Sequence, residues 1–240
     1  MPDLLLLLET SGPAPSVALA QAAGDTWAVL AKAPLPDAAP LPIMRHTEQL
    51  LPLIREVLPE DGWSRLAAVA TSSGPGSYTA LRAGLSSAKG ICLARGIPLL
   101  QASTLRGLSP KPGTTLPDGT SVGDAERVLT LLPARRNEVY AAVFEGPELR
   151  ETMVPVAVEN DSAWREAMLS TEITVVCATE SRLLDGFDAG RLRLVKSALR
   201  ADNLLWECQI RIAENRYDDL ASTVPVYVRP PFITQAKTRL

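Results

Sequence analysis

Hydrophobic residues in the first part of the chain follow two spacings, and their order predicts a strand-rich lobe. Continuous apolar runs bounded by glycine and proline are typical of buried strands. Apolar residues that recur every three or four positions are typical of helices. The pattern predicts three strands, a helix, a strand, a helix and a strand. In chain order these segments are LLLLLE (4–9), SVALAQ (16–21), TWAVLAKA (26–33), HTEQLLPLIREVL (46–58), LAAVATS (66–72), YTALRAGLSSAKGICLAR (78–95) and IPLLQA (97–102).

The rest of the chain repeats this order with almost no residue-level identity. A hairpin around the polar turn ARRN and a third strand come first, followed by alternating helices and strands. The repeat is therefore one of topology. In chain order the segments are RVLTLL (127–132), EVYAAVFE (138–145), ELRETMVPVAV (148–158), DSAWREAML (161–169), EITVVCA (172–178), ESRLLDGF (180–187), RLRLV (191–195) and DNLLWECQIRIAEN (202–215).

The repeated order predicts an α/β fold of two lobes, each with a mixed sheet and crossover helices. This plan resembles that of the actin-like ATPases, a duplicated ribonuclease-H-like fold whose members bind ATP between two such lobes. Fold alone says little about activity, so the residues have to decide. We expect residues 1–108 to form the N-terminal lobe, 109–123 a linker, 124–216 the C-terminal lobe and 217–240 a tail.

Composition and charge narrow the class of protein. The 240 residues are 46% hydrophobic and 21% charged, as in globular proteins. A net charge of −3 gives no global field that would attract nucleic acid. The opening MPDLLLLLETS is too short and too acidic for a signal peptide, and no stretch approaches the roughly 20 apolar residues that cross a bilayer. Three scattered cysteines suggest reduced core thiols, so we expect a cytoplasmic protein.

The turns that would hold phosphate in an ATPase are poorly suited to it. The first hairpin turn carries Glu9-Thr10-Ser11-Gly12, in which an acid is present but bulky residues follow. The second-lobe turn, 132–137, has no glycine, although a backbone cradle needs donors that converge without obstruction. His46 is the only histidine, which removes any multi-histidine metal site. We therefore expect no catalytic residue and no metal ligand in this chain.

The helix predicted over 78–95 has two unusual faces. Leu81, Leu85 and Cys92 lie on one side, and small residues lie on the other. Small residues weaken a helix but let another backbone approach closely. Two interpretations stay open: the helix is sandwiched inside its own lobe, or one side docks on another subunit. The small residues are Ala80, Ala83, Gly84, Ser87, Gly90 and Ala94.

Several segments together resemble the bacterial TsaB (YeaZ) family. SSGPGSYTALRAGL is similar to the GPGSFTGLRIG segment of that family, and RHTEQLLPLI to its His-Ser-Glu-x-Leu-Leu-Pro helix. LLPARRNEVYAAVF is similar to its Asp-Ala-Arg-Arg-x-Glu-Val-Tyr hairpin, with Pro133 in place of the aspartate. LLLLLETS resembles the opening, usually Asp-Thr-Ser, and PVYVRPP resembles the closing Pro-x-Tyr-x-Arg. The stretch 147–217 is only generic.

The resemblance implies a non-catalytic relative of the transferase TsaD. Such a subunit pairs with a TsaD-like protein through two helices of its N-terminal lobe and recruits a TsaE-like ATPase. The complex adds threonylcarbamoyl to the adenosine next to the anticodon in tRNAs that read ANN codons. This chain would then meet tRNA only indirectly, without a cofactor of its own. Weak binding of ATP, ADP or Mg²⁺ at an interface of the complex is left open.

The helix faces and the turns described above give two sets of candidate residues. The expected partner interface comprises Leu50, Leu51, Leu53, Ile54, Ala80, Leu81, Ala83, Gly84, Leu85, Ser87 and Ala88. A helix N-terminus after a glycine-rich turn can also attract an anion, because free backbone donors point outward there. The corresponding weak anion or nucleotide site comprises Glu9, Thr10, Ser11, Gly74, Gly76 and Ser77.

Two other functions and two structural questions stay open. An actin-like small-molecule kinase or ATPase would need a catalytic acid, for which Glu9 is the visible candidate, and a glycoprotease-type peptidase has less support. The isolated chain is a monomer or a homodimer. The basic stretch 229–240 either lies on the N-terminal lobe or reaches toward RNA or a partner.

Overall fold

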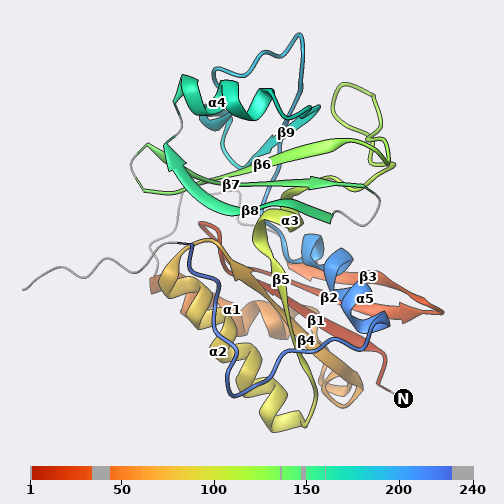
Figure 1. Cartoon of the computed structure of the whole chain (residues 1–240). Helices are drawn as coiled ribbons and strands as arrows, with labels where there is room; N and C mark the ends of the chain where they lie inside the picture. Colours follow the sequence, from red (N-terminus) through yellow and green to blue (C-terminus); the bar gives the residue numbers. More distant parts are fainter. Residues whose placement is uncertain (1, 34–43, 136, 147–149, 160, 229–240) are drawn as a thin grey trace, which may run out of the picture.

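The computed structural model describes residues 2–33, 44–135, 137–146, 150–159 and 161–228. The basic stretch 229–240, for which two roles were left open, lies outside these ranges. Figure 1 shows two sheets as separate lobes, with a short helix, α3 (Thr104–Leu108), between them. No helix in the described part of the chain is both long and apolar enough to cross a bilayer.

The first sheet has five strands in the order β3-β2-β1-β4-β5. β1 pairs antiparallel with β2 and parallel with β4, so the sheet is mixed, as expected. A 3-10 helix, η1 (Glu60–Arg65), leads into β4. The strands are β1 (Leu4–Glu9), β2 (Ser16–Ala23), β3 (Thr26–Ala33), β4 (Leu66–Gly74) and β5 (Leu99–Ser103).

Helices cover both faces of the first sheet. Leu4, Leu6 and Leu8 of β1 pack against α1 (Met44–Val57) and α2 (Tyr78–Arg95). The alternate side chains of β1 pack against η3 (Ala201–Leu204) and α5 (Leu205–Ala213). A strand buried on both faces shows no polar alternation, which is why β1 reads as an unbroken leucine run.

The second sheet repeats the topology of the first. Its order is β10-β9-β6-β7-β8, and β6 pairs antiparallel with β7 and parallel with β9. β6 therefore corresponds to β1, and the strand order around it is the same. This confirms the predicted duplication and the two-lobed actin-like, ribonuclease-H-like fold. The strands are β6 (Arg127–Pro133), β7 (Glu138–Glu145), β8 (Arg150–Glu159), β9 (Val175–Ala178) and β10 (Arg193–Lys196).

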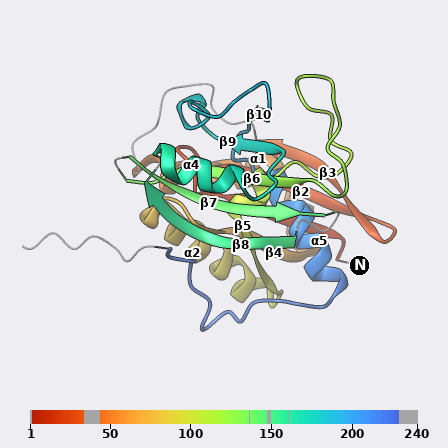
Figure 2. The same ribbon diagram turned by 45° about the horizontal axis from the view of Figure 1, so that its top comes forward.

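The two faces of the second sheet have different covers. One face packs against α4 (Ser162–Leu169) and η2 (Ser181–Leu183), and α4 lies over the strands in Figure 2. Asp161 begins α4 by accepting a hydrogen bond from the backbone N–H of Trp164 at 2.8 Å. The other face packs against α3 and against Leu116 and Val122 of the linker. The linker is thus part of the hydrophobic core of the second lobe, although the sequence predicted only a connecting segment.

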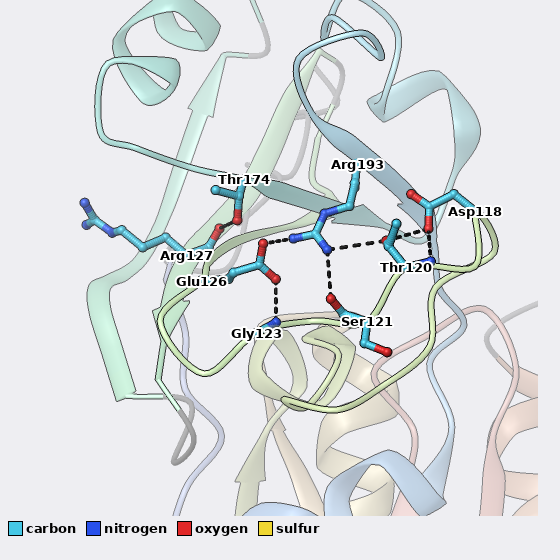
Figure 3. A network of polar contacts seen from close by, with 8 residues as sticks. All are labelled: Asp118, Thr120, Ser121, Gly123, Glu126, Arg127, Thr174 and Arg193. Atoms are coloured by element: carbon cyan, nitrogen blue, oxygen red, sulfur yellow. Dashed lines mark hydrogen bonds and ion pairs between the residues drawn. The ribbon is translucent and has the colours of Figure 1, made fainter.

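Polar contacts hold this linker segment in place. Arg193 of β10 points into it, donates a hydrogen bond to the carbonyl of Ser121 at 3.1 Å and forms an ion pair with Glu126 (Figure 3). Glu126 in turn accepts a hydrogen bond from the backbone N–H of Gly123 at 2.6 Å. We call this group, Ser121, Gly123, Glu126 and Arg193, the linker clasp.

The last helix returns to the first lobe. The sequence placed 202–215 within the range of the C-terminal lobe, but Ala201, Leu204, Leu205 and Cys208 pack on the first sheet. The physical reason is that the leucine-rich strand β1 needs apolar cover on both faces. The exact domain boundaries remain a proposal.

Candidate functional site

Two turns meet at the ends of β1 and β4, where an actin-like ATPase would hold phosphate. The backbone N–H of Ser77 donates to the carbonyl of Ser11 at 3.1 Å. A Cβ atom at Gly76 would lie 2.6 Å from the Cβ of Ser11, so only glycine fits there. The backbone N–H of Thr10 donates to Ser72 Oγ at 3.2 Å. The turns therefore pack directly on each other.

The carboxylate of Glu9 lies beneath these turns and is 1% exposed. It accepts hydrogen bonds from the backbone N–H of Ser11, at 2.5 Å, and from the Ser11 hydroxyl. Burial raises the pKa of Glu9, while the hydrogen bonds from Ser11, Ser72 and Thr10 partly oppose that rise. The Glu9 side chain is thus tied to its own turn and is buried away from solvent.

The side of this turn that faces the second lobe is closed by apolar side chains. A Cβ atom at Gly12 would lie 2.9 Å from Leu199 Cδ1. Leu199 belongs to a cluster with Leu105 and Leu108 of α3 and with Leu132 and Phe144 of the second sheet. The six residues of the expected anion site thus lie in one region, but side chains of the same chain fill the space beside Gly12 and Gly76.

Helix α2 follows the second turn with the bounds that the sequence predicted. Gly96 ends it in the left-handed conformation with φ 64°, and its N–H donates to the carbonyl of Cys92. Gly84 faces inward, because a Cβ atom there would lie 2.3 Å from Thr10 Oγ1. Gly90 differs: a Cβ atom there would meet nothing within 4 Å. The predicted small-residue face is therefore split between the core and the surface.

Burial divides the interface residues expected from the sequence into two groups. Four candidates keep exposed surface: Leu51 is 54% exposed, and Leu53, Ala83 and Ser87 are half-buried. The others face the core of their own lobe, because α1 and α2 must cover the first sheet, so their side chains cannot also meet a partner. These buried candidates are Leu50, Ile54, Ala80, Leu81, Gly84, Leu85 and Ala88.

The outer surface of α1 and α2 combines expected interface candidates with residues that the sequence did not single out. Leu93 is 78% exposed, more than any other large apolar side chain of the described residues. Ser86 and Gly90 are exposed on the same helix. We call Leu51, Ala83, Ser86, Gly90 and Leu93 the outer helix surface. A helical wheel separates large from small residues but does not show which side the sheet lies on, so the sequence could not locate this surface.

The expected tail begins with a segment that is bound to the first lobe. Asp218 bridges to Leu99 of the edge strand β5, and Lys89 Nζ donates to the carbonyl of Thr223 at 2.8 Å. The backbone N–H of Val226 donates to the carbonyl of Ser73 at 2.8 Å. Figures 1 and 2 show this segment, 214–228, passing along the outside of α2. We call it the C-terminal strap.

Metal-binding groups are absent from the described residues: no cluster of three or more His, Cys, Asp or Glu side chains could hold an ion there. His46 belongs to α1, but its side chain lies outside the described part. The three cysteines are buried and unpaired, and burial raises the pKa of the Cys92 thiol to about 11. Such thiols stay protonated at neutral pH and are inert.

Comparison with known proteins places the chain in a family. Residues 41–172 match the model of the TsaD family, tRNA N6-adenosine threonylcarbamoyltransferase. The tRNA threonylcarbamoyladenosine biosynthesis protein TsaB of Escherichia coli is 34% identical over 105 residues, which are 43% of this chain and 42% of that protein. TsaB of Haemophilus influenzae is 32% identical over 97 residues, 40% of this chain and 38% of that protein. The matched stretches thus span less than half of each relative.

A solved structure extends the likeness in fold to nearly the whole chain. YeaZ from Pseudomonas aeruginosa superposes with a TM-score of 0.69 at 24% identity and covers 93% of this chain and 100% of its own. That identity shows the shared fold, and the sequence matches show the relationship. The chain belongs to the TsaD family, and it is similar in sequence to TsaB proteins and in fold to YeaZ.

Proposed function

We propose that this chain is a non-catalytic scaffold subunit of a tRNA-modifying complex in the cytoplasm. It pairs with a TsaD-like protein, and the pair recruits a TsaE-like ATPase. Together they add threonylcarbamoyl to the adenosine next to the anticodon in tRNAs that read ANN codons. Sequence similarity to TsaB proteins supports the pathway, and the geometry of the first lobe supports the scaffold role.

The filled turn region is the observation that carries the non-catalytic assignment. Actin-like enzymes need open backbone donors where the two lobes meet, so that phosphate can bind. Here Ser11 lies against Gly76, and Leu199 lies against Gly12. Glu9, the remaining candidate acid, is buried and hydrogen-bonded to its own turn. Nucleotide binding at this position would require both turns to move apart.

The outer helix surface is the proposed docking site for the TsaD-like partner. Leu51 and Leu93 are large, exposed apolar side chains. Their burial against a partner would stabilise the complex by about 25 cal/mol for each Å² of apolar surface removed from water. Gly90 has open space before it and leaves room for close approach of another backbone. An isolated chain with this surface uncovered is expected to form homodimers through it.

Co-purification of matched variants tests this site. Leu51→Glu and Leu93→Glu place a charge on the outer helix surface and should abolish co-purification with a TsaD-like protein while leaving the melting temperature unchanged. Leu30→Glu is the control, because Leu30 is 58% exposed on the opposite edge strand, β3. Pairing that survives both helix variants, or fails equally in the control, would contradict the proposed surface.

Activity assays separate the scaffold from its rivals. The purified chain with TsaD-like and TsaE-like proteins should support threonylcarbamoylation of tRNA, and the chain alone should not hydrolyse ATP. Magnesium-dependent hydrolysis by the isolated chain that Glu9→Gln removes would establish the kinase or ATPase interpretation instead. Peptide hydrolysis sensitive to chelators would establish the peptidase.

A further inference from the structure

Exposed aromatic side chains gather where the C-terminal strap meets the start of α2. Tyr78 and Tyr227 are each 38% exposed, and Val224 and Val226 beside them are 65% and 48% exposed. Neither strap residues nor Tyr78 are needed for the proposed docking surface. The proposed docking surface therefore does not account for the closing motif PVYVR (225–229).

The two tyrosines and an arginine form an ordered stack. The ring centroids of Tyr78 and Tyr227 are 4.9 Å apart, with the planes inclined by 31°. Arg82 Cζ lies 5.1 Å from the centroid of Tyr78, and Arg82 Nη1 donates a hydrogen bond to the Tyr78 hydroxyl. The bond from Val226 to Ser73 fixes the strap next to Tyr227. We call Arg82, Tyr78 and Tyr227 the tyrosine stack.

The helix that carries Tyr78 is basic although the whole chain is acidic. Helix α2 contains Arg82, Lys89 and Arg95 and no acidic residue. The nearest acids along the strap are Asp218, paired with Arg211, and Asp219, which caps Ser222. Arg82 is thus the cation beside the rings, and Lys89 lies further along the same helix.

We propose that the tyrosine stack binds an unpaired base of single-stranded RNA. Proteins that bind single strands combine aromatic rings, on which bases stack, with cations that follow the phosphates. Tyr227 continues the Arg82–Tyr78 stack, so a base placed on Tyr227 extends it, and Arg82 and Lys89 of α2 supply cations for the phosphates. This inference rests on the proposed role in tRNA modification, where it adds a direct RNA contact to the contacts made through partners.

Fluorescence anisotropy with a labelled oligoadenylate RNA tests the site on the full chain. Wild type should bind the single strand more tightly than duplex RNA, because stacking needs unpaired bases. Tyr227→Leu should weaken binding about tenfold, while Tyr227→Phe, which keeps the ring, should not. Tyr217→Leu is the control, since Tyr217 is 40% exposed on the same strap and lies outside the stack.

If Tyr227→Leu detaches the strap from the first lobe, weaker RNA binding would not locate the site. Photocrosslinking of the wild-type protein therefore determines where the RNA binds. With wild-type protein and a 4-thiouridine RNA, crosslinks should fall within 78–82 or 222–228. Absence of RNA binding, equal binding by Tyr227→Leu, or crosslinks elsewhere would overturn the inference. Loss of TsaD pairing with unchanged RNA affinity in Tyr227→Leu would assign the stack to a protein partner instead. Because RNA binding and TsaD pairing are measured separately, failure of one leaves the other standing.

Discussion

In the first lobe, helices cover both faces of the sheet, whereas in the second lobe one face is covered by the short helix α3 and the linker. The strand orders around β1 and β6 are identical. One face of the first sheet is covered by η3 and α5, which follow the second sheet in the chain. One face of the second sheet is covered by α3 and the linker, which precede that sheet in the chain. Shared topology therefore does not imply shared surfaces. Among the described residues, a pair of long helices facing outward is found in the first lobe alone.

The difference supports the separate tasks that we propose for the two lobes. α1 and α2 bury one side on the first sheet and keep Leu51 and Leu93 exposed, so they can dock a partner without unfolding. The second lobe is attached through an apolar cluster that includes Leu199 and Phe144. This cluster fills the region where an active relative would need open space.

A charge in the central strand of the first lobe should have the largest effect. Leu6 is fully buried between the sheet and its helices, so Leu6→Asp buries a carboxylate without a partner. We expect the free energy of unfolding to fall by more than about 4 kcal/mol. Urea unfolding followed by circular dichroism measures it, with Leu30→Asp as the exposed control. Unchanged unfolding of Leu6→Asp would mean that the leucine-rich strand is not the core of this lobe.

The two glycines of α2 should respond in opposite directions. Gly84→Ala places a methyl group against Thr10 and should lower the free energy of unfolding by about 1–3 kcal/mol. Gly90→Ala meets open space and should raise it by up to about 1 kcal/mol, because glycine is a poor helix former. Thermal melting of both variants checks this. Equal changes would show that both glycines have the same surroundings, against the split between core and outer surface.

The linker clasp should stabilise only the second lobe. Arg193→Met removes the hydrogen bond to Ser121 and the ion pair with Glu126, and we expect a loss of about 1–2 kcal/mol. Hydrogen exchange should become faster in 113–126 and stay unchanged in α5, which covers the first sheet. Faster exchange in α5 would indicate that the two covers are coupled, contrary to the comparison.

Substitution of Glu9 should change the stability least, and the size of that change should depend on pH. Its pKa is raised by burial, so the folded state disfavours the charged form. Stability is then lost as the pH rises from the ordinary glutamate pKa of about 4.3 through the raised folded value. The Glu9→Gln variant stays neutral and should be more stable than wild type at pH 7, with a difference that disappears in acid. A lower stability of this variant at pH 7 would mean that Glu9 is stabilised as an anion.

Hydrophobic spacing predicted the elements well but not their partners. α2 and β1 have the expected bounds, because the leucine run and the glycine stop at Gly96 are local signals. The apolar stripe of α5 shows that the helix packs somewhere, but Leu204 and Cys208 do not encode which sheet receives it. The short helix α3 was missed because TLRGL is too short for a periodic pattern.

The sequence predicted the candidate site as a region, and the structure shows which of its residues are exposed. Gly84 and Gly90 fall on the same predicted face, yet one meets Thr10 and the other meets open space. Exposure depends on where the sheet lies, which is a tertiary property. The contacts of Tyr227 with Tyr78 depend on the path of the strap, and no local spacing signals that path.

Hydrogen exchange of the chain with and without a TsaD-like protein tests the central claim most directly. The claim is that the first lobe docks the partner through α1 and α2 while the second lobe does not. Slower exchange on binding should appear within 44–57 and 78–95 and be absent from 127–145 and 175–196. Slower exchange confined to the second lobe, or no change in either helix despite a stable complex, would contradict it.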